Sequence, residues 1–245
     1  MVKKQALSQN QENQFSDFNN GITEKTFGAL DEQQTDEPKV EVRIPEVKKI
    51  EKAEIREQED ENTAAIYPYK NLGGTVSYEI IRRTGSGEPF LIRHKDEKGK
   101  YIYKRPKNVN LIPYNLPNVR KAIEQGTPVW LTEGESKADT LNTLGFTATT
   151  CAFKGTDKWY NFYNKDIEGV KSLFLLIDND EDSEEFANAT SNTILRENET
   201  VSIYPIRINE ICSNLEIGAD IDDLIDKVGT ETVKATLETI ESTYA

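Results

Sequence analysis

Apolar and polar residues alternate in two different ways along the chain. From Pro128 onward, four short apolar runs, VWLT, FTATTCAF, KSLFLLID and TVSIYPI, alternate with the longer stretches ESKADTLNTL and SEEFANATSNTILREN. In the first long stretch Ala138, Leu141 and Leu144 recur every three residues, and Gly145 follows as a helix C-cap. Strands that alternate with helices predict an α/β domain, with a parallel sheet flanked by helices, over 128–245.

A β-rich segment comes before this domain. TVSYEIIRR, PFLIRH and YIYKRP are short runs rich in β-branched and aromatic residues, and glycine-containing turns separate them. They predict a small antiparallel sheet over about 66–107, and NVNLIPYNLPNVRKAIEQG then predicts a loop and a short helix. We therefore expect a small β-rich domain over 64–127.

Residues 1–63 have a composition typical of disorder. Their start is rich in Gln, Asn and Ser, and the run VEVRIPEVKKIEKAEIREQEDEN is mostly charged. Such a segment cannot bury enough apolar area to offset its chain entropy. We expect a disordered acidic arm or, alternatively, an arm that docks on a partner with a short helix around 47–60, where Val47, Ile50 and Ala53 are spaced by three.

Charge is distributed unevenly. The chain of 245 residues has a net charge of −13, yet residues 64–130 carry 12 basic and 5 acidic side chains. Cationic side chains follow phosphates and aromatic rings stack on bases, so this basic block predicts a nucleic-acid surface. Alternatively, the aromatic residues form the core of the small sheet. The candidate nucleic-acid residues are Arg82, Arg83, Arg93, Lys95, Tyr101, Tyr103, Lys104, Arg105 and Lys107.

Composition excludes several classes of protein. Two cysteines and one histidine cannot provide the four ligands of a structural zinc site, nor a disulfide framework. No apolar run is long enough to span a bilayer, and the N-terminus lacks the apolar region of a secretory signal. We expect a cytoplasmic protein without zinc, in which any metal is a hard, oxygen-bound cation such as Mg²⁺ or Mn²⁺.

Acidic residues follow two of the predicted parallel strands. Glu133 comes after VWLT, and Asp178 and Asp180 come after SLFLLI. The carboxyl ends of parallel strands gather at one edge of a sheet, so these carboxylates should lie close together. Their mutual repulsion would be relieved by a bound divalent cation. The pattern therefore predicts a magnesium site at this edge.

LTEGESKADTL and LLIDNDEDSEEFA together resemble the TOPRIM domain, which bacterial primases, topoisomerases and some nucleases share. Glu133–Gly134 and Asp178–Asn179–Asp180 match its two motifs. The similarity is closest to primase-like proteins of phages and mobile elements, and it covers about 66–228. GTDKWYNFY, with Gly155 and Trp159, is similar to a further segment of those proteins.

The resemblance implies Mg²⁺- or Mn²⁺-dependent nucleotidyl transfer on single-stranded DNA, during phage or mobile-element replication in a bacterial or phage-infected cell. Nucleotides and single-stranded DNA are the implied ligands, and a replicative helicase or another replication protein is a candidate partner in trans. Glu133 would act as general acid or base, while Asp178 and Asp180 would bind the metal. The segment GADIDDLI matches a Lys-Asp-x-x-Asp motif, with Ala219 in place of the lysine.

Four further residues have two interpretations each. Asp182 is a candidate alternative or indirect metal ligand, or a solvated loop charge. Asp220 and Asp223 are candidate accessory ligands, or acids at a helix N-terminus. Lys137 would contact a phosphate, or lie on a solvated helix face.

Two other functions fit the same motifs. A TOPRIM nuclease would use the same residues to cleave phosphodiesters. A non-catalytic remnant that binds DNA or a partner is favoured by Ser183, where the family often has glycine, and by the lack of a zinc ribbon in the sequence. The sequence also contains no P-loop motif of a fused helicase.

Overall fold

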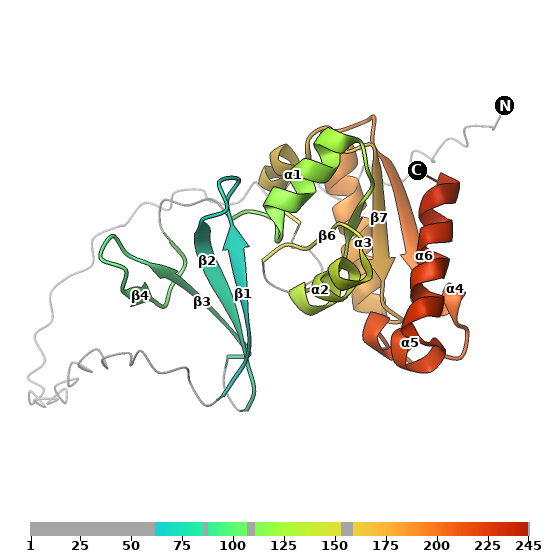
Figure 1. Ribbon diagram of the computed structural model, residues 1–245, viewed down its shortest axis with the longest axis horizontal. Coiled ribbons are helices and arrows are strands. Elements are labelled where there is room, and N and C mark those ends of the chain that lie inside the picture. Colours follow the sequence, from blue (N-terminus) through green and yellow to red (C-terminus); the bar gives the residue numbers. More distant parts are fainter. Residues whose placement is uncertain (1–61, 86–87, 107–110, 153–158, 245) are drawn as a thin grey trace, which may run out of the picture. The chain divides into compact units, whose positions relative to one another are not determined.

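The computed structural model describes residues 62–85, 88–106, 111–152 and 159–244. The arm expected over 1–63 therefore lies almost entirely outside the described residues, as do the helix expected around 47–60, Lys107 and Gly155. The described residues contain an antiparallel and a parallel sheet of four strands each (Figure 1).

The antiparallel sheet confirms the predicted β-rich segment. Its strands lie in chain order: β1 (Thr63–Lys70), β2 (Val76–Arg83), β3 (Phe90–Lys95) and β4 (Tyr101–Ile102). Strand β1 is not among the three runs from which the sequence predicts the sheet, and Pro68 lies inside it. Since β1 is an edge strand, it tolerates a residue that cannot donate a backbone hydrogen bond.

Tyrosines line the buried face of this sheet. Tyr69 and Tyr78 are fully buried, and their rings stack with centroids 4.7 Å apart. The Tyr78 hydroxyl donates to the Ile112 carbonyl oxygen at 3.0 Å and accepts from the Ile112 backbone N–H at 3.1 Å. The Tyr114 ring packs edge-on against Tyr69, with centroids 5.3 Å apart. Tyr78 therefore belongs to the core of the protein, as one of the two sequence interpretations proposed.

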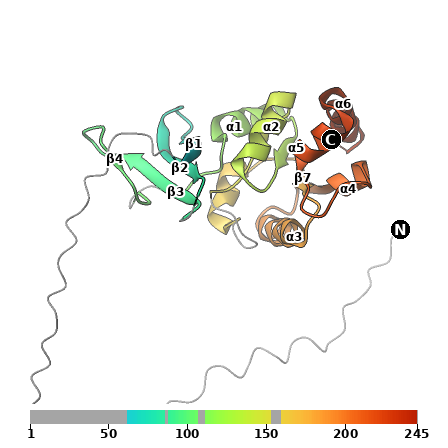
Figure 2. The same ribbon diagram turned by 90° about the horizontal axis from the view of Figure 1, so that it is seen from below.

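The second sheet is parallel, with the strand order β6-β5-β7-β8. Helices flank it (Figures 1 and 2), which confirms the predicted α/β architecture. Its strands are β5 (Val129–Leu131), β6 (Ala148–Thr149), β7 (Ser172–Ile177) and β8 (Ser202–Arg207). The helices are α1 (Leu116–Gln125), α2 (Glu135–Leu144), the 3₁₀ helix η1 (Asn161–Ile167), α3 (Glu181–Leu195), α4 (Ile208–Ile211), α5 (Ile221–Val228) and α6 (Thr230–Tyr244). Within the described ranges, no helix has the length and apolarity that crossing a bilayer requires.

A row of aromatic rings crosses the centre of the parallel sheet. Trp130, Phe174 and Tyr204 are register partners on neighbouring strands, and their rings stack at centroid distances of 4.8 and 5.0 Å. Helix α6 packs on this row, because the Trp130 indole N–H donates to Glu241 and the Tyr244 ring lies 5.2 Å from that of Tyr204. This packing fixes β5 and β7, the two strands whose carboxyl ends carry the candidate acids.

Candidate active site

The end of β5 positions Glu133. After the strand, Gly134 has φ 96° and ψ 153°, a conformation that is essentially restricted to glycine, and its N–H donates to Thr150 Oγ1 at 3.0 Å. Helix α2 begins at the next residue. The Glu-Gly pair of the sequence motif is therefore a sharp strand-to-helix turn that leaves the glutamate at the edge of the sheet.

Replacing Gly134 with alanine should destabilise this turn. A side chain at positive φ is strained, so we expect the free energy of unfolding to fall by about 1–3 kcal/mol in Gly134→Ala. Urea denaturation followed by circular dichroism measures the change. Gly99→Ala is a suitable comparison, because Gly99 has φ 79° in the exposed β3–β4 turn, where a Cβ would meet no atom within 4 Å. An unchanged unfolding free energy in Gly134→Ala would contradict this account of the turn.

The end of β7 positions the aspartates. Asp178 follows the strand directly and is buried, while Asp180 caps helix α3 by accepting a hydrogen bond from the Ser183 backbone N–H at 2.7 Å. The Ser183 hydroxyl lies 3.1 Å from Glu133 Oε2 and 3.3 Å from Asp178 Oδ2. Glu133 and Asp178 therefore meet at one edge of the sheet, as the strand pattern predicted, with the unexpected serine between them.

Asp178 has an unusual environment. Its side chain is only 4% exposed, and the Lys137 ammonium forms an ion pair with Oδ2. Burial raises the pKa of Asp178 to about 6, because the desolvation cost exceeds the opposing effect of Lys137, and the negative charges of Asp220 and Asp180 raise it further. The other oxygen, Oδ1, is buried without a hydrogen-bond partner among the described residues.

Residues of both sheets line a cleft of about 190 Å³ at this edge, which we call the acidic cleft. Tyr67, Arg82 and Phe90 come from the antiparallel sheet. The remaining lining residues follow β5, follow β7 or precede α5, and they are Glu133, Gly134, Glu135, Ser136, Lys137, Asp178, Asp180, Gly218 and Asp220. Among its described lining residues, the cleft thus combines carboxylates with an exposed cation, Arg82.

The acidic cleft has donors that suit a hard cation. Asp178 Oδ1 is a buried carboxylate oxygen without a hydrogen-bond partner in the described part of the chain, and Ser183 links Asp178 to Glu133. Magnesium sites commonly use one or two carboxylates and complete the shell with waters and substrate phosphates. As placed, however, no three Asp, Glu, His or Cys side chains of the described ranges form a ready-made metal site. The Lys137 ammonium instead provides the positive charge at Asp178.

The remaining candidate acids lie around this cleft. Asp182 is exposed in the first turn of α3 and lines an adjoining cleft of about 540 Å³, together with Asp178 and Asp180. Asp220 and Asp223 form a capping box at the start of α5, in which each side chain accepts a hydrogen bond from the other's backbone N–H. Their hydrogen bonds thus fit the helix-terminus interpretation, although Asp220 also lines the acidic cleft.

The candidate basic residues separate into two groups. Arg82, Lys95, Lys104 and Arg105 are exposed. Arg93 is buried, pairs with Glu79, lies 4.0 Å from the centroid of the Tyr101 ring, and donates to the Tyr103 hydroxyl at 3.4 Å. Arg93 and its two tyrosines therefore contribute to the structure of the sheet. Arg83 is partly buried, and Lys137 lies inside the protein at Asp178.

Several residues at the site had no sequence signal. Glu135 is buried and accepts a hydrogen bond from the Tyr69 hydroxyl at 2.8 Å, which joins α2 to the antiparallel sheet. The two residues are 66 positions apart, so no local pattern could pair them. In the sequence Ser183 is only a departure from the family pattern, and its contact with two carboxylates emerges only when β5 and β7 are brought side by side.

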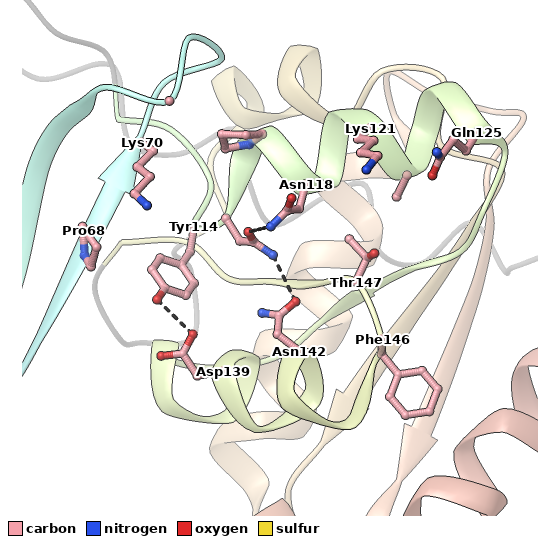
Figure 3. A pocket seen from close by; sticks show the side chains of 14 residues that line it. Pro68, Lys70, Tyr114, Asn118, Lys121, Gln125, Asp139, Asn142, Phe146 and Thr147 are labelled. Atoms are coloured by element: carbon pink, nitrogen blue, oxygen red, sulfur yellow. Dashed lines mark hydrogen bonds between the residues drawn. The ribbon is translucent and has the colours of Figure 1, made fainter.

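A second cleft of about 650 Å³ lies between β1, α1 and α2 (Figure 3). Its wall is ordered by side-chain hydrogen bonds: the Tyr114 hydroxyl donates to Asp139 at 2.9 Å, and the Asn115 amide donates to Asn142 at 3.0 Å. Lys70 and Lys121 line it from β1 and α1. None of these residues was predicted as part of a site.

No protein-family model and no curated protein matches the chain. Several solved structures, however, match the chain. A DNA primase domain from Pseudomonas aeruginosa superposes with a TM-score of 0.52 and 17% identity, covering 69% of this chain and 49% of that one. The DnaG catalytic core gives a TM-score of 0.50 and 17% identity, covering 71% of this chain and 52% of that one. This chain thus spans about half the length of these neighbours, and its described part has a primase-like fold similar to that of the DnaG catalytic core.

Proposed function

We propose that the protein is a primase-like nucleotidyltransferase that joins nucleotides on a single-stranded DNA template, with Mg²⁺ or Mn²⁺, in phage or mobile-element replication. The observation that carries this proposal is the acidic cleft, where Glu133 and Asp178 meet at the carboxyl ends of β5 and β7, and which Arg82 of the antiparallel sheet also lines. Carboxylates beside a cation suit a reaction in which a phosphate is bound, neutralised and attacked. The primase-like fold supports the same assignment.

Each side chain has a role in this reaction. Glu133 accepts the proton of the attacking sugar hydroxyl, whose oxygen bonds to the α-phosphorus as pyrophosphate leaves. Ser183 donates a hydrogen bond that orients the Glu133 carboxylate, and Arg82, which lines the same cleft, contacts the phosphates. Asp178, through Oδ1, and Asp180 would hold the divalent cation, which when bound neutralises charge on the reacting phosphate.

A primer-synthesis assay tests the proposal. Labelled nucleotides, single-stranded DNA and Mg²⁺ or Mn²⁺ should give short labelled products without an added primer. Labelled DNA incubated without nucleotides would instead be shortened if the protein is a nuclease. Absence of both reactions would favour a non-catalytic remnant, for which the Lys137–Asp178 ion pair is a specific supporting observation. Repeating the assay with a replicative helicase present tests for a partner in trans.

The exposed cations should give DNA binding a steep salt dependence. Replacing Arg82, Lys95, Lys104 and Arg105 together with alanine should flatten the slope of log affinity against log salt by up to about 3, since each phosphate contact on a single strand contributes about 0.7. Fluorescence anisotropy with a labelled oligothymidine over a NaCl series measures the slope. Arg93 is left intact because it is buried and paired.

A charge-matched variant controls for net charge. Lys165, Lys171, Arg196 and Lys227 are exposed cations of the parallel-sheet part, and replacing them with alanine should leave the slope nearly unchanged. Equal flattening in both variants, or binding of the wild type that ignores salt, would rule out a binding surface on the antiparallel sheet.

A further inference from the structure

The acidic cleft contains a buried cation that the protein itself supplies, the ammonium group of Lys137. Lys137 pairs with Asp178 Oδ2, and the two side chains are only 10% and 4% exposed. Lysine is almost never buried to this extent unless an anion holds it. Asp178 Oδ1 meanwhile lies buried without a hydrogen-bond partner among the described residues, so the carboxylate is engaged through one oxygen and unsatisfied at the other.

The position of Lys137 in its helix makes this arrangement more specific. Helix α2 begins at Glu135, which places Lys137 in the first turn, where the helix dipole disfavours a positive charge. The helix itself therefore gives no reason for a buried lysine here. The ion pair with Asp178 explains why Lys137 is buried. Glu133, Asp180 and Asp220 line the same cleft, and their negative charges strengthen the need for a cation at Asp178.

We propose that Lys137 is a tethered counterion that neutralises Asp178 through Oδ2, and that a divalent cation binding through Oδ1 has to compete with this positive charge. The inference rests on the proposed function insofar as that function requires a metal at Asp178. On this proposal, Lys137 lowers the affinity of the site for metal by competing with it. This role differs from both sequence interpretations of Lys137, a phosphate contact and a solvated charge.

Manganese titration of the full chain tests this, with free Mn²⁺ followed by electron paramagnetic resonance. Lys137→Gln keeps a hydrogen-bond donor for Asp178 but removes the charge, so it should bind Mn²⁺ about tenfold or more tightly than the wild type. Lys137→Arg, which keeps the charge, should resemble the wild type. Lys121→Gln removes one exposed lysine from the second cleft and should also have no effect. Asp178→Asn added to Lys137→Gln should abolish the gain.

Equal or weaker Mn²⁺ binding by Lys137→Gln would overturn the inference. If circular dichroism shows that this variant is unfolded, the wild type gives the answer through ¹⁵N-lysine NMR. The ammonium signal of a buried, paired lysine should shift or broaden on saturation with Mg²⁺, and an unchanged signal would also overturn the inference. Neither measurement depends on primer synthesis. Tighter metal binding in a protein that makes no primers would therefore sustain the inference while the proposed function fails.

Discussion

Glu133→Gln is expected to lower primer synthesis by about 10²–10⁴-fold, the range that a general acid or base contributes. The change removes the proton acceptor but keeps the size of the side chain and its ability to accept a hydrogen bond from Ser183. Folding should therefore be nearly unaffected, and the loss should appear in the turnover number. Steady-state incorporation of labelled nucleotides at saturating Mg²⁺ measures it.

Glu185→Gln is the matched control, because Glu185 is exposed on α3 and does not line the acidic cleft. It should retain wild-type synthesis. If Glu133→Gln also retained full activity, Glu133 would not be the acid or base, and the assignment of this cleft as the catalytic site would be wrong. If both carboxamide variants lost activity equally, the loss would reflect net charge or folding.

The parallel sheet was predictable because its strands and helices carry strong local patterns. The five consecutive apolar residues before Asp178 form a strand that neighbouring strands cover on both edges, so burial and sequence agree. The placement of Glu133 beside Asp178 then follows from topology alone, because parallel strands end at the same edge. Gly145 also ends α2 as predicted, with φ 102°.

The buried ion pairs were less predictable, because they join residues that are distant in sequence. Lys137 precedes its partner Asp178 by 41 residues, and Arg93 meets Glu79 only across the β2–β3 pairing. Both cations look like surface charges in the sequence, where lysine and arginine are usually exposed. Their burial emerges only when a carboxylate on another element comes into reach. The sequence could thus locate the acids of the site but not the buried cation, Lys137, that neutralises Asp178.

The Lys137–Asp178 ion pair should also dominate the stability of this edge of the sheet. Lys137→Met would leave the buried carboxylate uncompensated, and we expect it to lower the free energy of unfolding by about 3–5 kcal/mol at pH 8. Asp178→Asn removes a carboxylate whose ionised form burial already disfavours, so it should cost much less. The double variant removes both charges and should be close to the wild type or more stable, which urea denaturation of all four proteins would show as strong coupling. If the change in unfolding free energy of the double variant equalled the sum of the two single changes, the two charges would not interact.

The same double variant isolates the pH dependence of Asp178. The pKa of Asp178 in the folded protein, about 6, lies above the ordinary value of 3.8, so between these pH values the folded state binds more protons than the unfolded state. The unfolding free energy of the wild type therefore contains a contribution that falls as pH rises from about 4 to 6, by about 3 kcal/mol in total. The double variant lacks this group, so its stability relative to the wild type should increase over the same interval and level off above it. A relative stability that is constant from pH 4 to pH 8 would show that burial imposes no cost on ionising Asp178. There would then be no electrostatic reason for the Lys137 ammonium to lie beside it.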